Sequence, residues 1–370
     1  MQKPILCISE APYMPLVQYN TLYNRRIERI HPLISPEEMI KKIPLSAAAF
    51  QTVLDGRAEV EHILSGKDRR LLVIAGPCSI HDPVSALDYA QRLCVLRKKY
   101  ADVFCIIMRV YFEKPRTNLG WRGFIVEPGL DGIINIAAGL EKARTLLVHI
   151  AELGLPAASE ILDPIIPQYT ADLISWASIG ARSAESQIHR ELASGLSMPV
   201  GFKNPTDGAI EIAINAIISA RQPHAFLGVM QNGLSAVMHT AGNEYAHLVL
   251  RGGSHGSNYD AETISRSAAA LQQQGIEPAL LIDCSHGNSQ KNPQRQFDVF
   301  MSVLDMRRSS VTLNCVRGCM LESFIHEGSA AVGTGTIQPS YGISITDPCM
   351  SWEMTEQLLS QAAVSVRSIV

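Results

Sequence analysis

The stretch LLVIAGPCSIHDP, residues 71–83, holds one complete transition from a strand to a helix. Its first five residues, Leu71–Ala75, are all apolar, as in a buried strand, and Cys78 follows in the loop. Asp82 and Pro83 have the residue types of a helix N-cap and a first helical position. We therefore expect a buried strand, then a loop with a reactive side chain, then a helix.

The same succession recurs along the rest of the chain. Seven more apolar runs resemble strands and end at or near a side chain that can take part in chemistry: Phe104–Met108, Ala157–Glu160, Ser175–Ala181, Val200–Phe202, His247–Leu250, Ala279–Ile282 and Val311–Met320. Most of these runs are separated by stretches with helical periodicity. Reactive side chains at the C-terminal ends of successive strands are typical of a (β/α)8 barrel. The sequence thus predicts an α/β protein of the TIM-barrel type.

The chain is longer than such a barrel requires. A barrel takes about 250 residues, and this chain has 370. We expect residues 1–68 to form an N-terminal arm and helices that serve oligomerisation or regulation, and residues 69–370 to form the catalytic barrel. Residues 224–245 break the rhythm of strands and helices and suit short strands and turns better, so we expect a β-strand insertion there.

Composition and charge exclude several classes of protein. The chain is 46% apolar and 18% charged, and its formal net charge is −3, which gives no general attraction to nucleic acid or to a membrane surface. No apolar run approaches the roughly 18 residues of a membrane span, and the N-terminus does not resemble a signal peptide. Five of the eight cysteines lie in apolar runs, where free thiols pack as small hydrophobes. We therefore expect a cytoplasmic protein without a nucleic-acid or membrane partner.

Six positively charged side chains lie at or just beyond predicted strand ends. They are Arg109, Lys114, Arg116, Arg182, Lys203 and Arg251. Any one of them alone would most often be a salt-bridge partner or a solvated loop residue. Six at one barrel mouth would repel one another strongly unless anions bound between them. Because arginine and lysine suit phosphate and carboxylate groups, we expect an anionic substrate.

A second group of side chains at the strand ends suits a divalent metal ion. Cys78 and His286 follow the first and seventh predicted strands, Glu322 follows the eighth, and Asp347 lies further along. A thiolate, an imidazole and two carboxylates are compatible with manganese, iron, cobalt or zinc and poor for calcium. The alternatives are a buried thiol for Cys78 and a core imidazole for His286, because spacing along the sequence does not show that the four residues meet.

Seven stretches of the chain together resemble the type I 3-deoxy-D-arabino-heptulosonate 7-phosphate (DAHP) synthases. They are LLVIAGPCSIHDP (71–83), MRVYFEKPRT (108–117), LISWASIGARSAESQIHRELASGLSMPVGFKN (173–204), LRGG (250–253), DCSHGNS (283–289), MLES (320–323) and YGISITDPC (341–349). The resemblance implies a barrel enzyme that condenses phosphoenolpyruvate with D-erythrose 4-phosphate and water. The products are DAHP and phosphate, in the first step of the shikimate pathway to the aromatic amino acids.

The resemblance also implies roles for individual residues. The metal ligands would be Cys78, His286, Glu322 and Asp347. Phosphoenolpyruvate would contact Arg109, Lys114, Gly180, Ala181, Arg182, Lys203, Arg251 and His286, and Glu160 is included as a further substrate-binding residue. Erythrose 4-phosphate would contact Lys114, Pro115, Arg116 and Thr117, close to Asp347. The catalytic residues would be Lys114, His286 and Cys78, with Lys114 as the proton donor.

Two prolines depart from the family pattern. Pro205 stands where the family has a glycine, two residues after Lys203, and Pro348 replaces the alanine of the family's TDAC. Proline forbids the positive φ that glycine permits, so a shifted turn and altered kinetics are expected. A paralogue serving a secondary pathway and a related 3-deoxy-octulosonate 8-phosphate synthase stay as alternatives. An inactive sensor of aromatic amino acids is disfavoured, because all four metal ligands are present.

The extension and the β-insertion point to feedback control. Family members with both elements are typically dimers or tetramers inhibited by Phe, Tyr or Trp, so we expect a homodimer or homotetramer with an aromatic effector. The pocket would lie between Met1–Ile30 of one subunit and, in another, Leu162–Gln168, Ser197 and Phe226–Gly228. Ile166 and Phe226 would supply apolar walls, and the space at Gly228 would favour tyrosine, whose hydroxyl needs room and a partner. The alternative is that Gly228 only serves a turn.

Overall fold

The computed structural model describes residues 22–116, 120–309, 311–330 and 340–367. The chain divides into two compact units, residues 1–34 and 35–370. Within the described residues, every helix and strand belongs to the second unit.

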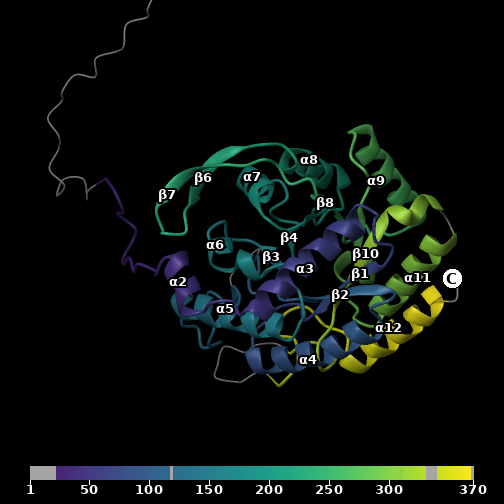
Figure 1. The fold of residues 1–370 in the computed structure, drawn as a ribbon, viewed down its shortest axis with the longest axis horizontal. Helices are drawn as coiled ribbons and strands as arrows, with labels where there is room; N and C mark the ends of the chain where they lie inside the picture. Colours follow the sequence, from purple (N-terminus) through teal and green to yellow (C-terminus); the bar gives the residue numbers. More distant parts are fainter. Residues whose placement is uncertain (1–21, 117–119, 310, 331–339, 368–370) are drawn as a thin grey trace, which may run out of the picture. The chain divides into compact units, whose positions relative to one another are not determined.

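Eight parallel strands of that unit close into a barrel, with helices around it (Figure 1). In the order in which they pair, the strands are β1 (Leu71–Gly76), β2 (Phe104–Arg109), β3 (Ala157–Ile161), β4 (Trp176–Ile179), β5 (Val200–Lys203), β8 (His247–Leu250), β9 (Leu280–Asp283) and β10 (Val316–Glu322). Strand β10 pairs with β1 and closes the ring. The (β/α)8 fold predicted from the sequence is confirmed.

The helices start where their capping residues predict. Asp82 accepts hydrogen bonds from the amides of Val84 and Ser85 and so caps α4, and Asp260 caps α9 through the amide of Thr263. The α-helices after β1 are α4 (Pro83–Lys99), α5 (Ile136–Glu152), α6 (Pro167–Thr170), α7 (Gln187–Gly195), α8 (Ile210–Ala220), α9 (Ala261–Gln273), α10 (His286–Ser289), α11 (Arg295–Ser309) and α12 (Trp352–Arg367), and a 3-10 turn, η1 (Ala171–Leu173), follows α6.

The last strand is shorter than the apolar run that predicted it. Val311–Cys315 forms a 3-10 helix, η2. Pairing with β9 begins at Val316, opposite Leu280. The strand therefore starts where its neighbour in the barrel does, and the residues before it connect α11 to the sheet.

Helix α3 (Ala47–Leu64) closes the end of the barrel that lies opposite the C-terminal ends of the strands. Its Val60, Ile63 and Leu64 are buried in one cluster with inward-facing strand residues such as Leu72 and Ile107. Because this end is filled by packed apolar side chains, chemistry is confined to the other end. The division into residues 1–68 and 69–370 stays a prediction. The structure groups α2 (Pro36–Lys42) and α3 with the barrel, since both pack onto it.

The predicted β-insertion is an antiparallel hairpin of β6 (Ala225–Val229) and β7 (Ser235–His239). It lies outside the barrel, beside α7 (Figure 1). At the hairpin turn, Gln231 Nε2 donates to Gln168 Oε1 at 3.0 Å. The insertion therefore contacts α6, the short helix that follows β3.

None of the helices in the described parts of the chain is long and apolar enough to span a membrane.

Candidate active site

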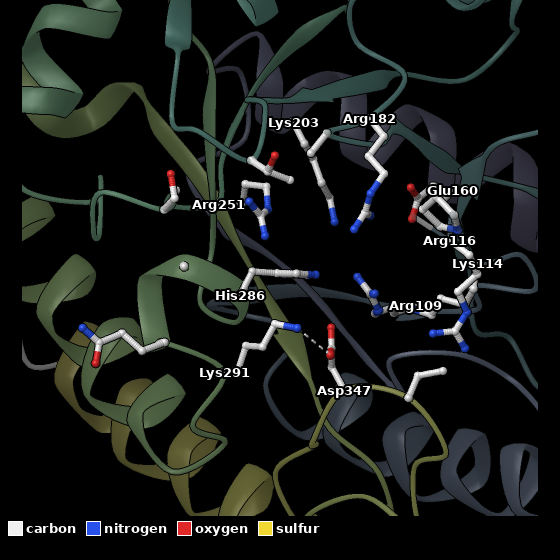
Figure 2. A pocket seen from close by; sticks show the side chains of 18 of the residues that line it. Arg109, Lys114, Arg116, Glu160, Arg182, Lys203, Arg251, His286, Lys291 and Asp347 are labelled. Carbon is white, nitrogen blue, oxygen red and sulfur yellow. Dashed lines mark hydrogen bonds and ion pairs between the residues drawn. The ribbon is translucent and has the colours of Figure 1, made fainter. Parts of the chain in front are cut away.

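A cavity of about 730 Å³ opens at the C-terminal ends of the barrel strands (Figure 2). Among the described residues that line it, two are carboxylates, Glu160 and Asp347, and seven carry a positive charge. The seven are Arg109, Lys114, Arg116, Arg182, Lys203, Arg251 and Lys291. The structure thus brings together all six cations predicted from the strand ends and adds Lys291. Such an excess of positive charge in one cavity favours bound anions.

Two of the cations are deeply buried and share an aromatic neighbour. Arg109 is 1% exposed and Lys203 is 3% exposed. The ring of Tyr111 lies 3.7 Å from the guanidinium carbon of Arg109 and 5.4 Å from Lys203 Nζ, so its face stabilises both charges. Burial opposes the charge of Arg109, but Glu322 and the other acidic groups around it together outweigh burial and hold the pKa of Arg109 above its usual range.

Arg109 retains unused hydrogen-bonding capacity. Its Nη2 pairs with Glu322 Oε1 at 2.9 Å, and its Nε donates to the carbonyl of Pro77 at 3.1 Å. Its Nη1 is buried and donates to no described residue. An unpaired buried donor is costly, so this atom fits a bound anion.

Three potential metal ligands lie close together next to Lys114, one of the cations of the cavity. Cys78 Sγ, an oxygen of Glu322 and an oxygen of Asp347 lie within 4.8 Å of one another. Lys114 Nζ donates to Cys78 Sγ at 2.8 Å, and the Asp347 amide does so at 3.4 Å. A thiolate with two carboxylates is a donor set that suits a divalent transition metal, so the residues present fit such an ion.

The charges of the cluster are strongly coupled. Burial, and next the Glu322 carboxylate, raise the pKa of the Cys78 thiol. Burial would also raise the pKa of Glu322, but His286, Arg109 and Lys114 together outweigh burial and lower that pKa to about 2. Glu322 is therefore ionised at neutral pH, and a metal would take the place of the thiol proton on Cys78.

His286, the fourth predicted ligand, lies at the edge of this cluster. Its Nε2 is 3.8 Å from Glu322 Oε1, and its Nδ1 is 3.0 Å from Asp283 Oδ2. The group of atoms within 4.8 Å of one another does not include it. Asp283 also pairs with Lys203 Nζ at 3.2 Å. His286 and Lys203 overcome the effect of burial and hold the pKa of Asp283 well below its usual range.

The backbone of the loop after β9 is in an unusual conformation. His286, Gln290 and Lys291 have φ values of +54°, +55° and +59°, in the left-handed region. Non-glycine residues rarely adopt this region, and such residues concentrate at functional sites. The turn directs Lys291 into the cavity, where its Nζ pairs with Asp347 Oδ1 at 3.1 Å (Figure 2).

The remaining predicted substrate residues have different positions. Pro115 and Ala181 line the cavity. Gly180 is buried, and a Cβ there would lie only 2.0 Å from Glu160 Oε1, so a larger residue would displace the Glu160 carboxylate from its present position. Thr117 lies outside the described residues.

Four residues of the site were given no role from the sequence: Tyr111, Ser285 and Lys291, and Asp283, which was marked only as the polar end of a predicted strand. Asp283 binds Lys203, and the Ser285 hydroxyl donates to Glu322 Oε2 at 2.6 Å. Both belong to DCSHGNS (283–289), so their place at a strand end was the available signal. Lys291 comes five residues after His286, and only the left-handed turn brings it into the cavity.

The residues predicted to bind an effector lie around the hairpin. Ile166 and Phe226 are partly buried and pack onto the main core, and Ser197 is exposed. A Cβ on Gly228 would lie 2.6 Å from Cγ of Met238 on the facing strand. Within this chain, therefore, the space that Gly228 leaves is taken up by Met238. Residues 1–21 of the arm lie outside the described residues.

Comparison with known proteins gives consistent matches over most of the chain. Residues 42–360 match the DAHP synthetase I family. The tyrosine-sensitive phospho-2-dehydro-3-deoxyheptonate aldolase of Salmonella typhimurium is 47% identical, with 93% of this chain and 96% of the relative covered. The tryptophan-sensitive enzyme of Escherichia coli K12 is 46% identical, with 92% and 97% covered.

A solved structure matches as well. That of phospho-2-dehydro-3-deoxyheptonate aldolase from Francisella tularensis superimposes with a TM-score of 0.89 at 44% identity, and covers 92% of this chain and 98% of its own. The tyrosine- and tryptophan-sensitive relatives differ by one percentage point in identity. Overall similarity therefore does not distinguish between effectors.

Proposed function

Because the chain belongs to the DAHP synthetase I family and is a DAHP synthase, we propose that the cavity at its barrel mouth is where the reaction occurs. The enzyme condenses phosphoenolpyruvate with erythrose 4-phosphate and water, and gives DAHP and phosphate in the first step of the shikimate pathway. The observation that supports this site is the set of seven cations around one cavity, next to a group of potential metal ligands. Two substrates that both carry phosphate need such a surplus of positive charge.

The cations of the cavity differ in how deeply they are buried, and this difference suggests which part of the cavity each substrate occupies. Phosphoenolpyruvate suits the side of Lys203, Arg182 and Arg251, together with the buried Arg109 (Figure 2). Erythrose 4-phosphate suits the side of Lys114 and the exposed Arg116. Arg116 Nε donates to the carbonyl of Trp121 at 2.7 Å, which orients its guanidinium.

The family is metal-dependent, and we assign the ion to Cys78, Glu322 and Asp347, with His286 as the fourth ligand. The nature of the donors fits manganese, iron, cobalt or zinc. When bound, the ion would supply Lewis-acid chemistry that polarises the sugar aldehyde.

The residues of the chain then act on two anions that repel each other. C3 of phosphoenolpyruvate attacks the aldehyde carbon, water adds at C2, and phosphate leaves. Holding the two reactants in the correct orientation can lower the barrier by about 7–11 kcal/mol. Lys114, which lies between the two substrate regions, donates a proton to the oxygen that was the aldehyde.

Substitution of the cations tests the division of the cavity. Lys203→Ala and Arg251→Ala are expected to raise KM for phosphoenolpyruvate about 10- to 100-fold, because a charged hydrogen bond contributes about 1.5–3 kcal/mol. Arg116→Ala should raise mainly KM for erythrose 4-phosphate. Steady-state kinetics with each substrate varied in turn measures both. Arg367→Ala, which removes an exposed ion pair with Asp102, serves as the control. If Arg116→Ala changed only KM for phosphoenolpyruvate, the assignment of the two sides would be wrong.

An aromatic amino acid is the proposed effector of a dimeric or tetrameric enzyme. The support comes from the hairpin, because its Phe226 and the nearby Ile166 are apolar and only partly buried. The Gln231–Gln168 hydrogen bond ties the hairpin to the segment after β3, and Glu160 at the end of β3 lines the active-site cavity. Tyrosine is the effector proposed from the sequence, and the inhibition assay below decides between it and the other two aromatic amino acids, since relatives sensitive to tyrosine and to tryptophan are equally similar to this chain.

Inhibition assays test the effector. Tyrosine at millimolar concentration is expected to inhibit more strongly than phenylalanine or tryptophan. Phe226→Ala should weaken that inhibition at least about tenfold, because it removes most of an aromatic contact surface, while leaving kcat unchanged. Leu227→Ala, on the exposed face of the same strand, is the control. Stronger inhibition by phenylalanine or tryptophan would contradict the assignment.

A further inference from the structure

Three buried asparagines from three different loops surround the backbone that carries Arg251. Asn204 follows β5, Asn258 lies between β8 and α9, and Asn288 lies in α10. Their exposed fractions are 0%, 8% and 6%. None of the three is among the described residues that line the active-site cavity, so any effect on substrate must be transmitted through other residues.

Asn204 and Asn258 bond to each other and to the same short segment. Asn204 Oδ1 accepts from the amide of Arg251 at 2.9 Å and from Asn258 Nδ2 at 3.1 Å. Asn204 Nδ2 donates to the carbonyl of Gly252 at 3.1 Å, and Asn258 Oδ1 accepts from the amide of Gly252 at 2.7 Å. Each side-chain amide is therefore fixed by partners at both of its ends.

Asn288 holds the segment from the next loop. Its Nδ2 donates to the carbonyl of Leu250 at 3.1 Å and to that of Asp283 at 2.9 Å. Its Oδ1 accepts from the backbone amide of Asn258 at 2.9 Å. The network thus links the ends of β5, β8 and β9, and these strands position Lys203, Arg251 and His286.

The backbone around Arg251 has a complete set of partners. The Gly287 amide donates to the carbonyl of Arg251 at 3.0 Å. From the Leu250 carbonyl to the Gly252 carbonyl, every backbone donor and acceptor is thus hydrogen-bonded, either to a neighbouring segment or, for the Gly252 amide, to Asn258 of the same loop. Gly252 has a φ of +70°, and a Cβ there would lie 2.5 Å from the Asn288 amide nitrogen, so the loops also approach too closely for a larger residue.

The Arg251 side chain, by contrast, is held weakly. It forms no ion pair with a described residue, and its only hydrogen bond to the described chain is a long one, 3.4 Å, from Nη1 to the Gly252 carbonyl. Arg109 is different, because Glu322 and the carbonyl of Pro77 fix its guanidinium directly. The orientation of Arg251 must therefore come from its backbone.

We propose that Asn204, Asn258 and Asn288 are positioning residues that aim the Arg251 guanidinium at the phosphoenolpyruvate anion. The inference rests on the proposed role of Arg251 in binding that substrate. Because its backbone is fixed, the Arg251 side chain samples fewer conformations before the anion binds. The protein therefore loses less conformational entropy on binding.

The test compares two buried asparagines. Asn258→Ala should raise KM for phosphoenolpyruvate about tenfold, the equivalent of one or two buried hydrogen bonds. Its kcat and its KM for erythrose 4-phosphate should stay within about twofold of wild type. Asn243→Ala is the matched control. Asn243 is 6% exposed and donates to the carbonyls of Ala193, Leu196 and Met198, away from the cavity. It should lower Tm comparably and leave both KM values unchanged.

Two further variants make the outcome decisive. Asn258→Ser keeps a polar group but is too short to bridge Gly252 and Asn204, and it replaces Asn258→Ala if that variant does not fold. Arg251→Ala tests the premise. If Arg251→Ala raises KM for phosphoenolpyruvate and neither Asn258 variant does, the positioning role is overturned. If Arg251→Ala itself has no effect, the proposed substrate site fails instead. If Asn243→Ala and Asn258→Ala changed KM equally, the asparagines would only stabilise the fold, and the positioning role would again be overturned.

Discussion

Cys78→Ser is expected to abolish DAHP synthase activity by removing the bound metal. The thiol of Cys78 lies within 4.8 Å of oxygens of Glu322 and Asp347, and it is the only soft ligand of that group. A serine hydroxyl stays protonated at neutral pH and is a much poorer ligand for manganese, iron, cobalt or zinc than a thiolate. Loss of a second-sphere contact already lowers metal affinity about 10- to 100-fold, so loss of a ligand should exceed that range.

Two measurements check this prediction. The metal content of the purified variant, determined after dialysis, should fall to background, and activity should not return at metal concentrations that restore the chelated wild-type enzyme. Cys94→Ser is the control, since Cys94 is a partly buried thiol on α4 whose contact is the carbonyl of Leu153. A metal-free Cys78→Ser protein with full activity would remove the basis for the site.

Lys114→Met should have the second-largest effect, a fall in kcat of about 10²- to 10⁴-fold, the usual contribution of a general acid. Methionine keeps most of the side-chain length and removes the charge and the proton. Lys114 Nζ donates to Cys78 Sγ at 2.8 Å and faces the cavity, so KM should also rise for both substrates. The loss in kcat separates Lys114 from cations that only bind.

Single-turnover kinetics at saturating concentrations of both substrates measures this effect on chemistry. Lys142→Met, on the exposed side of α5, should leave every constant unchanged. A Lys114→Met enzyme with normal kcat and raised KM values would assign Lys114 to binding alone and leave the proton donor to be found elsewhere.

The strand ends and their cations were predictable because parallel strands in a barrel are buried on both sides. Each gives a short run of apolar residues, such as Leu71–Ala75, and the first polar residue after it marks the end that faces the cavity. One sequence therefore sufficed to place Arg109, Lys203 and Arg251 at one mouth. The family resemblance then supplied roles that charge alone could not assign.

Positions that depend on loop conformation were not predictable. Nothing in the sequence signals that His286 and Lys291 adopt positive φ values, so the offset of His286 from the metal ligands and the entry of Lys291 were missed. The asparagine network was missed for a related reason, because hydrogen bonds among loop residues follow no periodic pattern. At Gly228, the sequence did not reveal that Met238 on the facing strand takes up the free space.

The end of the barrel filled by α3 has a consequence for the sequence of events in one turnover. Val60, Ile63 and Leu64 pack into the interior from below, so reactants must arrive from the side of the strand C-termini. A molecule bound against the buried Arg109 and Lys203 then lies behind one bound at the exposed Arg116. On the proposed division of the cavity, we therefore expect ordered binding, with phosphoenolpyruvate before the sugar phosphate. Erythrose 4-phosphate that binds first would block the path of phosphoenolpyruvate to the deeper position. At high concentrations of erythrose 4-phosphate, we therefore expect the steady-state rate to fall instead of reaching a plateau.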